Sequence, residues 1–379
     1  MPGAPVQGSK RVLALDAIRG VAILSVIATH SLSATVAATG SYAIPSTIFM
    51  AFDYGQYGVE TFFVLSGWLI FSLYATGRPF SQAVYWSRRW ARIWPLWAIF
   101  LIATYLFYTV DDPGMPVWLA VLLGLLFLGW LSPVLVAVPL GGLTIQQEMG
   151  HYLLFSLFRR RSAAFLAGTV VVGYLSGWAV EFLVPRLEPG SLLASASEAW
   201  LRLSLFRSWP FFLLGAASFV IWRSWRQGGV RDLLEQRRWT AVVVAVALLL
   251  GMLSLYGPQV PGYFVLGYVV ITALIALASN VLPLAGPALR SIGRYSYFMY
   301  FFHFWVLRWI EDLYRRSSLP GDNSTSTEYN TALLVAIWVV TTAVAWAVGF
   351  VSWRLLERRV IALAQKYVRD SSHTHAHQA

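Results

Sequence analysis

The sequence predicts an all-α fold, a polytopic transmembrane helix bundle with about ten spans. Of its 379 residues, 58% are hydrophobic and only 12% are charged, whereas soluble domains carry about 25% charged residues. Apolar runs recur along the whole chain, and a membrane-spanning helix needs about 20 such residues. Because lipid offers no hydrogen-bonding partner to exposed backbone, each run is expected to be helical. The lipid bilayer is therefore the first expected partner of this chain.

Other features of the composition exclude whole classes of function. There is no cysteine, so disulfides and thiolate chemistry are excluded. The net charge of +11 is compatible with nucleic-acid binding, but the basic residues lie between the apolar runs, where the positive-inside rule accounts for them. We therefore expect no nucleic-acid partner. The first apolar run is also too long for a cleavable signal peptide.

The apolar runs divide the chain into a tail, one membrane domain and a second tail. Residues 1–12 are expected to form a cytoplasmic tail, residues 13–359 the membrane domain, and residues 360–379 a basic cytoplasmic tail. A polar and aromatic stretch, 40–56, separates the first two spans. The predicted spans are 13–38, 58–75, 93–110, 143–158, 163–184, 208–222, 239–256, 262–280, 295–313 and 331–353.

One apolar segment, 117–140, is broken by glycine and proline residues and makes the topology ambiguous. If it crosses the membrane, the 28 lysines and arginines divide about evenly between the two sides. If it is re-entrant or lies flat, most basic residues fall on the side of the N-terminus and most of the 17 acidic residues on the other. The positive-inside rule favours the second arrangement, with both termini cytoplasmic. Irregular backbone at membrane depth must be buried by protein or line a cavity, so this segment is expected to be a wall of the active cavity.

Two residues of the first span, Arg19 and His30, do not belong in a lipid-facing helix. A charged side chain at membrane depth costs about 2.5–3.5 kcal/mol on insertion scales, so such residues are usually paired or functional. Their separation corresponds to about 16 Å of helical rise and about three turns, so both point to one face. His30 is either a general base or a helix-packing residue. Asp16, one turn before Arg19, is either a substrate-binding or a structural residue.

A basic and aromatic cluster precedes the predicted third span. Arg89 and Arg92 are three positions apart and therefore share a helical face, while Arg88 and Trp90 flank Arg89. Guanidinium groups match phosphate geometry and an indole can stack on a base. The alternative is a positive-inside anchor with an aromatic belt.

Glu148 is the candidate partner of the imidazole of His30. On the re-entrant topology, Glu148 lies near the outer face at the level of His30, where a carboxylate can orient a catalytic histidine. His151 is three positions further along nearly the same face. A Glu-x-x-His pair without further ligands is a weak metal signal, so we expect no metal site.

Three further polar residues lie within or at the ends of apolar runs. Glu60, near the outer end of the second span, is a possible substrate contact, and Ser66 is followed by Gly67, which allows close helix approach. Ser66 lacks the nucleophile-elbow motif, so a serine nucleophile is not expected. His303, in the middle of the ninth predicted span, is either structural or functional.

The order of these motifs resembles the acyltransferase-3 family of integral membrane O-acyltransferases over residues 13–359. The motifs in question are LDAIRGVAILSVIATH, GVETFFVLSGWLI, RRWARIWPLW, TIQQEMGHYLLFSLF, GRYSYFMYFFHFW and SWRLLERRV.

The resemblance assigns family positions to individual residues. In the family's first motif, an Arg or Lys is followed by ten other residues and then by His, and Arg19 and His30 match these two positions. Arg89 and Arg92 match the family's Arg-x-x-Arg motif. Glu148 matches the first Glu of a Val-Glu-Glu-Gln-Phe-Tyr stretch. The chain departs from that stretch directly afterwards, where it has Met, Gly and His instead of Glu, Gln and Phe.

The remaining matches lie near the C-terminus. His303 matches a histidine late in the family's spans. Glu357 matches the Glu of a C-terminal motif, without the proline that often follows it.

The resemblance implies an enzyme that uses acyl-CoA, often acetyl-CoA, as a co-substrate, with no bound cofactor. The donor would bind on the cytoplasmic side of a bacterial-type plasma membrane, and the acceptor would be a hydroxyl group of a carbohydrate or a glycosylated metabolite. Arg89 and Arg92 would hold the phosphates, His30 would act as general base, and Glu148 would orient His30 or hold the sugar. Direct transfer and an acyl-enzyme both remain open.

Two other function classes also fit the intramembrane polar residues. Arg19 and His30 could serve a proton relay in a transporter or flippase of a lipid-linked or glycosylated substrate. A noncatalytic membrane scaffold is the third class. The acceptor, the acyl chain length and the oligomeric state are not predicted by the sequence.

Overall fold

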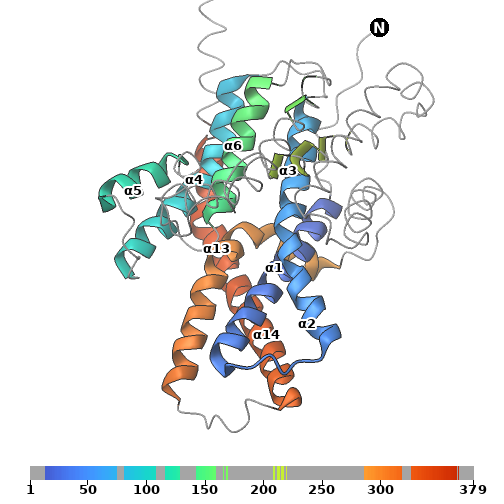
Figure 1. The fold of residues 1–379 in the computed structure, drawn as a ribbon. Coiled ribbons are helices and arrows are strands. Elements are labelled where there is room, and N and C mark those ends of the chain that lie inside the picture. Colours follow the sequence, from blue (N-terminus) through green and yellow to red (C-terminus); the bar gives the residue numbers. More distant parts are fainter. Residues whose placement is uncertain are drawn as a thin grey trace, which may run out of the picture.

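The computed structural model describes residues 13–74, 81–107, 116–128, 142–158, 286–317 and 326–364, together with isolated positions at 165–219 and Lys366. Every regular element in these ranges is a helix (Figure 1), and no strand is present among them. The predicted all-α class is confirmed for this part of the chain. The predicted spans 239–256 and 262–280 lie wholly outside the described residues, and 163–184 lies largely outside them, with three described positions; 208–222 has eight described positions, all helical.

Six of the described α-helices overlap predicted spans, and their agreement with the predicted bounds differs from helix to helix. Their bounds are α1 Leu13–Thr39, α2 Ser46–Asp53, η1 Tyr54–Tyr57, α3 Gly58–Tyr74, α4 Gln82–Phe107, α5 Val117–Leu125, α6 Gly142–Phe158, α13 Pro287–Arg316 and α14 Thr327–Ser352, with the π-helical turn η5 Trp353–Glu357. Among the described residues, three helices are long and apolar enough to cross a membrane, namely Leu15–Thr39, Gln82–Phe107 and Thr327–Ala364.

Two helical regions were not predicted in full. The polar stretch 40–56 contains α2 and η1, because its aromatic and aliphatic side chains pack against the end of α1, with Ile44 and Phe52 in one cluster with Leu32. Helix α4 begins at Gln82 rather than at residue 93, so the arginine cluster lies on its first turns. Hydropathy marks the part of a helix that matches the hydrocarbon layer, and helices continue beyond that layer.

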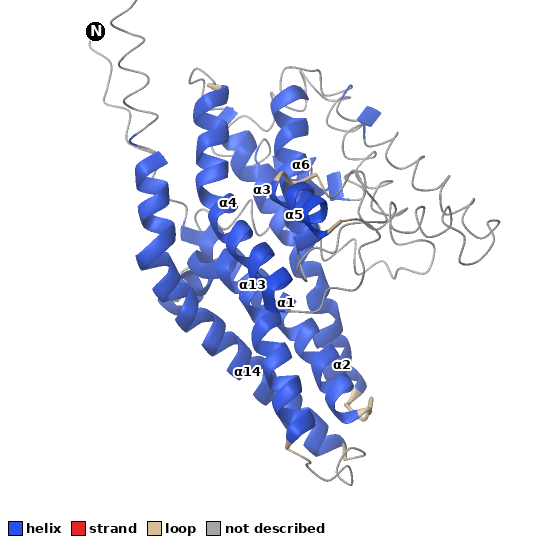
Figure 2. Cartoon of the chain, turned by 90° about the vertical axis from the view of Figure 1, so that its left-hand side faces the viewer, coloured by secondary structure: helices blue, strands red, loops and turns tan. Residues whose placement is uncertain are grey.

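Helices α1 and α13 run parallel in direct contact, and α14 packs against both (Figure 2). The two glycines at the α1–α13 crossing, Gly20 and Gly293, allow this approach, since a Cβ on Gly293 would lie 1.6 Å from the carbonyl oxygen of Asp16. Small residues permit this packing between membrane helices. Helix α14 runs in the opposite direction, and its Trp338 indole donates a hydrogen bond of 3.1 Å to the carbonyl of Leu24.

Helices α3, α4 and α6 complete the core around this pair. The carbonyl of Ala22 in α1 would lie 2.3 Å from a Cβ on Gly58, so α3 begins in close contact with α1. Helix α6 runs antiparallel to the first half of α4, where the hydroxyl of Tyr85 donates to the carbonyl of Tyr152 at 3.1 Å. Helix α4 contacts α13 through the hydroxyl of Tyr297, which donates to the carbonyl of Ile93 at 3.1 Å.

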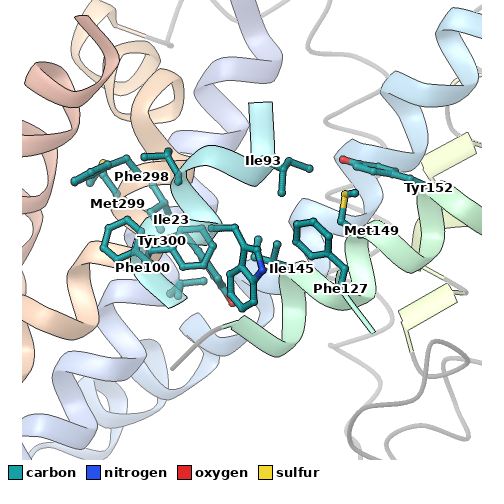
Figure 3. Close-up of a cluster of buried hydrophobic side chains, with 14 of the residues drawn as sticks. Ile23, Ile93, Phe100, Phe127, Ile145, Met149, Tyr152, Phe298, Met299 and Tyr300 are labelled. Atoms are coloured by element: carbon teal, nitrogen blue, oxygen red, sulfur yellow. The ribbon is translucent and has the colours of Figure 1, made fainter. Parts of the chain in front are cut away.

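The ambiguous segment 117–140 is described only up to residue 128. Helix α5 has nine residues, well below the roughly 20 needed to cross a bilayer. The indole of Trp97 donates to the carbonyl of Gly124 at 2.7 Å, so α5 returns to the middle of α4. Phe127 then stacks on Trp97 and lies beside Met149 of α6 (Figure 3). Residues 129–140 lie outside the described residues, so the re-entrant course of this segment stays a prediction.

The predicted role of this segment as a cavity wall is wrong for its described part. None of residues 117–128 lines the pocket between α1, α3, α4, α6 and α13 that is described in the next subsection. Phe127 instead packs in the hydrophobic core with residues of α4 and α6, and Val121 and Leu125 pack against that core, while Val117, Trp118, Leu122 and Leu126 are exposed.

Candidate active site

A pocket lies between α1, α3, α4, α6 and α13. Its volume is about 70 Å³, whereas sites for drug-sized ligands span roughly 300–1,000 Å³. Polar and charged side chains form one part of its lining, and large apolar side chains form the rest. The lining residues are Arg19, Phe62, Phe63, Ser66, Leu69, Ile70, Arg89, Arg92, Ile93, Thr144, Ile145, Glu148, Tyr152, Ser296, Tyr297 and Tyr300.

Helix α1 contributes Arg19 to the pocket. Its guanidinium lies 3.3 Å from the carboxylate of Asp16, one turn earlier on the same helix. Asp16 is 4% exposed and Arg19 14% exposed by side chain, so the pair is largely buried. Asp16 therefore offsets part of the charge of Arg19.

Helix α6 contributes Glu148, which is held by two hydroxyl groups. Ser66 of α3 donates a hydrogen bond of 2.7 Å to its carboxylate, and the hydroxyl of Tyr152 donates a second one. The prediction that Glu148 lies at the level of His30 is wrong, because this carboxylate lies in the pocket with Arg19. The sequence could not show this, since the depth of α6 is set by its packing on α3 and α4.

Helix α4 contributes Arg89 and Arg92. The guanidinium of Arg89 lies over the rings of Tyr85 at 5.3 Å and Tyr152 at 5.0 Å, so it is held between two aromatic faces. Arg92 lines the pocket and is also exposed. The three-residue spacing thus places both guanidiniums on one face, as predicted.

The flanking members of the arginine cluster do not reach the pocket. Arg88 is exposed and points away from the lining. Trp90 is 36% exposed and packs against Trp94 and Phe127. The structure therefore gives neither residue a position for donor binding in this pocket. Each lies beside Arg89 in the sequence but on a different face of the helix.

The charges of the pocket do not cancel. Three guanidinium groups and one carboxylate, that of Glu148, belong to the described lining of the pocket. Asp16 lies outside that lining and offsets part of the charge of Arg19. At membrane depth, where the surroundings screen charge weakly, the remaining positive charge favours an anionic group. The pocket is thus chemically suited to phosphate or carboxylate.

His30 lies elsewhere on α1, beside two rings of α13. Its ring centroid is 5.4 Å from that of His303 and 4.5 Å from that of Phe304. His303 is fully buried, and its Nδ1 lies 2.9 Å from the carbonyl oxygen of Met299. Because Arg19 shares the pocket with residues of α13 and His30 contacts α13 directly, both face the same helix, as the sequence predicts.

Tyr300 joins the two regions. It lines the pocket, and its ring centroid is 6.0 Å from that of His303, one turn further along α13. The basic pocket and the histidine pair are therefore neighbouring regions along α1 and α13.

The remaining predicted site residues lie outside both regions. His151 is fully buried, with its Nε2 3.0 Å from the hydroxyl of Ser208 and its ring against Phe63. Glu60 lies in the first turn of α3 and does not line the pocket. Within the described ranges, no group of three or more histidine or acidic side chains could hold a metal ion.

The sequence interpretation missed the tyrosines of the site. Tyr152 contacts both Glu148 and Arg89, and Tyr297 and Tyr300 line the pocket from α13. One signal was available for Tyr152, since it lies four positions after Glu148 and therefore on the same helical face.

The fold and the pocket define an integral membrane protein with an internal basic pocket. The chain matches the model of a family described as an acyltransferase domain over residues 12–351. Because the match covers nearly the whole chain, the protein belongs to the acyltransferase-3 family, and the predicted resemblance is confirmed. It is a membrane acyltransferase. No curated protein and no solved structure matches the chain significantly.

Proposed function

We propose that the protein transfers an acyl group, acetyl in the simplest case, from acyl-CoA to a hydroxyl group of a carbohydrate or glycosylated metabolite. The observation that carries the proposal is the convergence of Arg19, Arg89 and Arg92 on one intramembrane pocket within an acyltransferase domain. No cofactor is required for this chemistry, and acyl-CoA is a co-substrate.

The arginines suit the phosphates of the donor. Guanidinium groups form forked, charge-assisted hydrogen bonds with phosphate oxygens. Arg92, which is exposed and also lines the pocket, would meet the donor first. Arg89 would present a guanidinium already oriented by its two tyrosines, so that little side-chain entropy is lost on binding. The small volume of the pocket admits one part of the donor rather than the whole molecule.

His30 is the proposed general base. One ring nitrogen takes the proton of the acceptor hydroxyl while the oxygen attacks the thioester carbonyl. The carbon–sulfur bond then breaks, and the CoA thiolate leaves and receives that proton from the imidazolium. Arg19 and His30 are separated by about 16 Å of helical rise, a gap that the long, flexible pantetheine arm of the donor would bridge.

The proposed location is a bacterial-type plasma membrane with both termini in the cytoplasm. The antiparallel course of α1 and α14 supports termini on one side, since α1 begins at the end of the bundle where α14 finishes. The donor pocket lies toward the same end of α1 as the N-terminus, which agrees with a cytoplasmic supply of acyl-CoA.

The test uses purified protein in proteoliposomes with acetyl-CoA as donor and octyl β-glucoside as the acceptor probe. Release of the CoA thiol and formation of acetylated glucoside are measured together. His30→Ala is expected to lower kcat by at least about 100-fold, the lower end for loss of a general base, with KM for acetyl-CoA unchanged. A wild-type protein that releases no thiol contradicts the proposed donor.

A matched pair of variants tests the donor pocket. Arg89→Ala is expected to raise KM for acetyl-CoA by about tenfold, which corresponds to about 1.4 kcal/mol. Arg88→Ala removes the neighbouring charge that lies outside the pocket, and should leave KM within about twofold, as expected for a solvent-exposed charge. If the two substitutions change KM equally, Arg89 acts only through the general positive charge near the membrane, and its proposed contact with the donor is wrong.

The same proteoliposomes separate this function from transport. A proton-coupled transporter or flippase moves its substrate in response to a pH gradient and consumes no thioester. A scaffold does neither, and tolerates replacement of Arg19, His30 and Glu148.

A further inference from the structure

His303 has a fixed tautomer and an unused ring nitrogen. Its Nδ1 lies 2.9 Å from the carbonyl oxygen of Met299. A carbonyl oxygen can only accept, so Nδ1 carries the proton, and in the neutral ring Nε2 carries a lone pair. This Nε2 is buried and has no hydrogen-bond partner among the described residues. Buried polar atoms are usually paired, so an unpaired one in a ring beside the proposed base calls for an explanation.

Among the described residues, the titratable ring whose centroid lies nearest to that of His303 is that of His30. The two ring centroids are 5.4 Å apart and the ring planes are tilted by 39°. An N–H···N hydrogen bond spans about 3 Å, and each imidazole nitrogen lies about 1 Å from its centroid, so bonded rings have centroids about 5 Å apart. The rings do not hydrogen-bond in this structure, but their centroid separation of 5.4 Å is close to that of bonded rings. The ring of Phe304 packs against both imidazoles, with centroids 4.5 Å from His30 and 4.0 Å from His303.

No carboxylate of the pocket takes this place. Glu148, the expected partner of His30, accepts hydrogen bonds from Ser66 and Tyr152 in the other region. A general base needs an orienting group that holds its second nitrogen. On the described part of the chain, His303 is the group in position to do so.

We propose that His303 is a positioning residue for His30. Its Nε2 accepts the ring N–H of His30 when the acceptor binds, which leaves the opposite nitrogen of His30 free to take the hydroxyl proton. This inference rests on the proposed function, and it assigns to a neutral histidine the part that a carboxylate has in other catalytic histidine pairs.

Two substitutions separate this role from simple packing. In His303→Asn, the amide can still donate to Met299 but no atom remains at the position of Nε2. In His303→Gln, the longer side chain places an amide oxygen near the position of Nε2 and gives up the bond to Met299. Positioning predicts that Gln preserves kcat better than Asn. Packing alone predicts the reverse, because Asn keeps the native hydrogen bond.

Both variants are assayed in proteoliposomes with acetyl-CoA and octyl β-glucoside. His303→Asn is expected to lower kcat by at least about tenfold, as a misoriented base does, with KM for acetyl-CoA within about twofold of wild type. The loss of kcat in His303→Gln, expressed as a logarithm, should be at most half of the loss in His303→Asn. An Asn variant as fast as wild type, or faster than the Gln variant, overturns the proposal.

A measurement on the wild-type protein tests the proposal without requiring that the variants fold. Solid-state NMR of protein with nitrogen-labelled histidines, in the presence of octyl β-glucoside, should show a coupling between ring nitrogens of His30 and His303. Absence of the coupling overturns the proposal whatever the variants do. If wild type shows the coupling but releases no thiol from acetyl-CoA, the proposed function fails while the contact between the histidines stands.

Discussion

The crossing of α1 and α13 at Gly293 makes a sharp prediction about stability. A Cβ at this position would lie 1.6 Å from the carbonyl oxygen of Asp16 and 2.8 Å from the backbone nitrogen of Gly20. An ordinary carbon–oxygen contact is about 3.3–3.6 Å, so Gly293→Ala forces the two helices apart by nearly 2 Å, about the difference between these distances. Both obstructing atoms belong to the backbone, so no rotamer change relieves the clash.

The expected cost of Gly293→Ala combines two opposing terms. Alanine favours a helix interior over glycine by about 1 kcal/mol. Overpacking a well-packed contact costs typically about 1–3 kcal/mol, and occasionally more, and the rigid backbone here places the cost at or above the upper end. We therefore expect a net loss of about 2 kcal/mol in the free energy of unfolding. Activity should fall further, because displacement of about 1 Å at a site can cost about 100-fold in rate.

Gly349→Ala is the matched control on α14. The nearest atoms to its added Cβ are side-chain carbons of Tyr295 at 3.2 Å and Phe298 at 3.3 Å, which can move by the few tenths of an ångström required. The helix-propensity gain of about 1 kcal/mol then leaves this variant close to wild type. The two substitutions are chemically identical and differ only in what the new methyl group meets.

Equilibrium unfolding by denaturant in detergent micelles, followed by tryptophan fluorescence, measures both variants. Midpoints at unchanged slope convert to free-energy differences. If Gly293→Ala unfolds at the same midpoint as Gly349→Ala, the close crossing of α1 and α13 is wrong. The positions of Arg19 and His30 relative to α13 would then be wrong as well.

Two further substitutions test the contacts that shape the pocket and its neighbouring core. Tyr152→Phe removes the hydroxyl that binds Glu148 but keeps the ring under Arg89. The carboxylate of Glu148, with one hydrogen bond fewer, should then compete with the donor phosphates for the arginines and raise KM for acetyl-CoA by about tenfold, or about 1.4 kcal/mol. An unchanged KM would contradict a role of Tyr152 in keeping Glu148 away from the arginines. Trp97→Phe leaves the carbonyl of Gly124 without its 2.7 Å donor, and should lower the unfolding free energy by about 1–3 kcal/mol, measured in the same denaturant experiment, whereas wild-type stability would show that α5 is held by packing alone.

The bounds of a helix were predictable from the sequence where the helix coincides with an apolar run. The bounds of α1 and α3 lie within a residue or so of the predicted spans 13–38 and 58–75, because in these segments the helix and the apolar run coincide. Helix α4 differs, since its first turns carry the arginines and remain helical outside the apolar run. Periodicity predicted correctly that Arg89 and Arg92 share a face.

The grouping of the site residues was only partly predictable. Residues on one helix, such as Arg19 and His30, have a relation fixed by helical geometry. Glu148 lies on another helix, and its depth follows from hydrogen bonds with Ser66 and from the packing of α6, neither of which leaves a periodic signal. The role of α5 depends likewise on the indole of Trp97 in a distant segment.

The parallel pairing of α1 and α13 explains how one helix can serve two chemically different regions. Arg19 lines the basic pocket together with Tyr297, and His30 lies beside the ring of His303 further along the same two helices. Because a helix rises by a fixed 1.5 Å per residue, the separation of the two regions does not depend on loop geometry. The clash that a methyl group at Gly293 would create shows that the register of the pair is set by backbone contact. On the proposed function, the arginines hold the donor by its phosphates, so an acyl-pantetheine, which keeps the arm but lacks the nucleotide and its phosphates, should bind more weakly at the arginines while leaving the histidine pair intact.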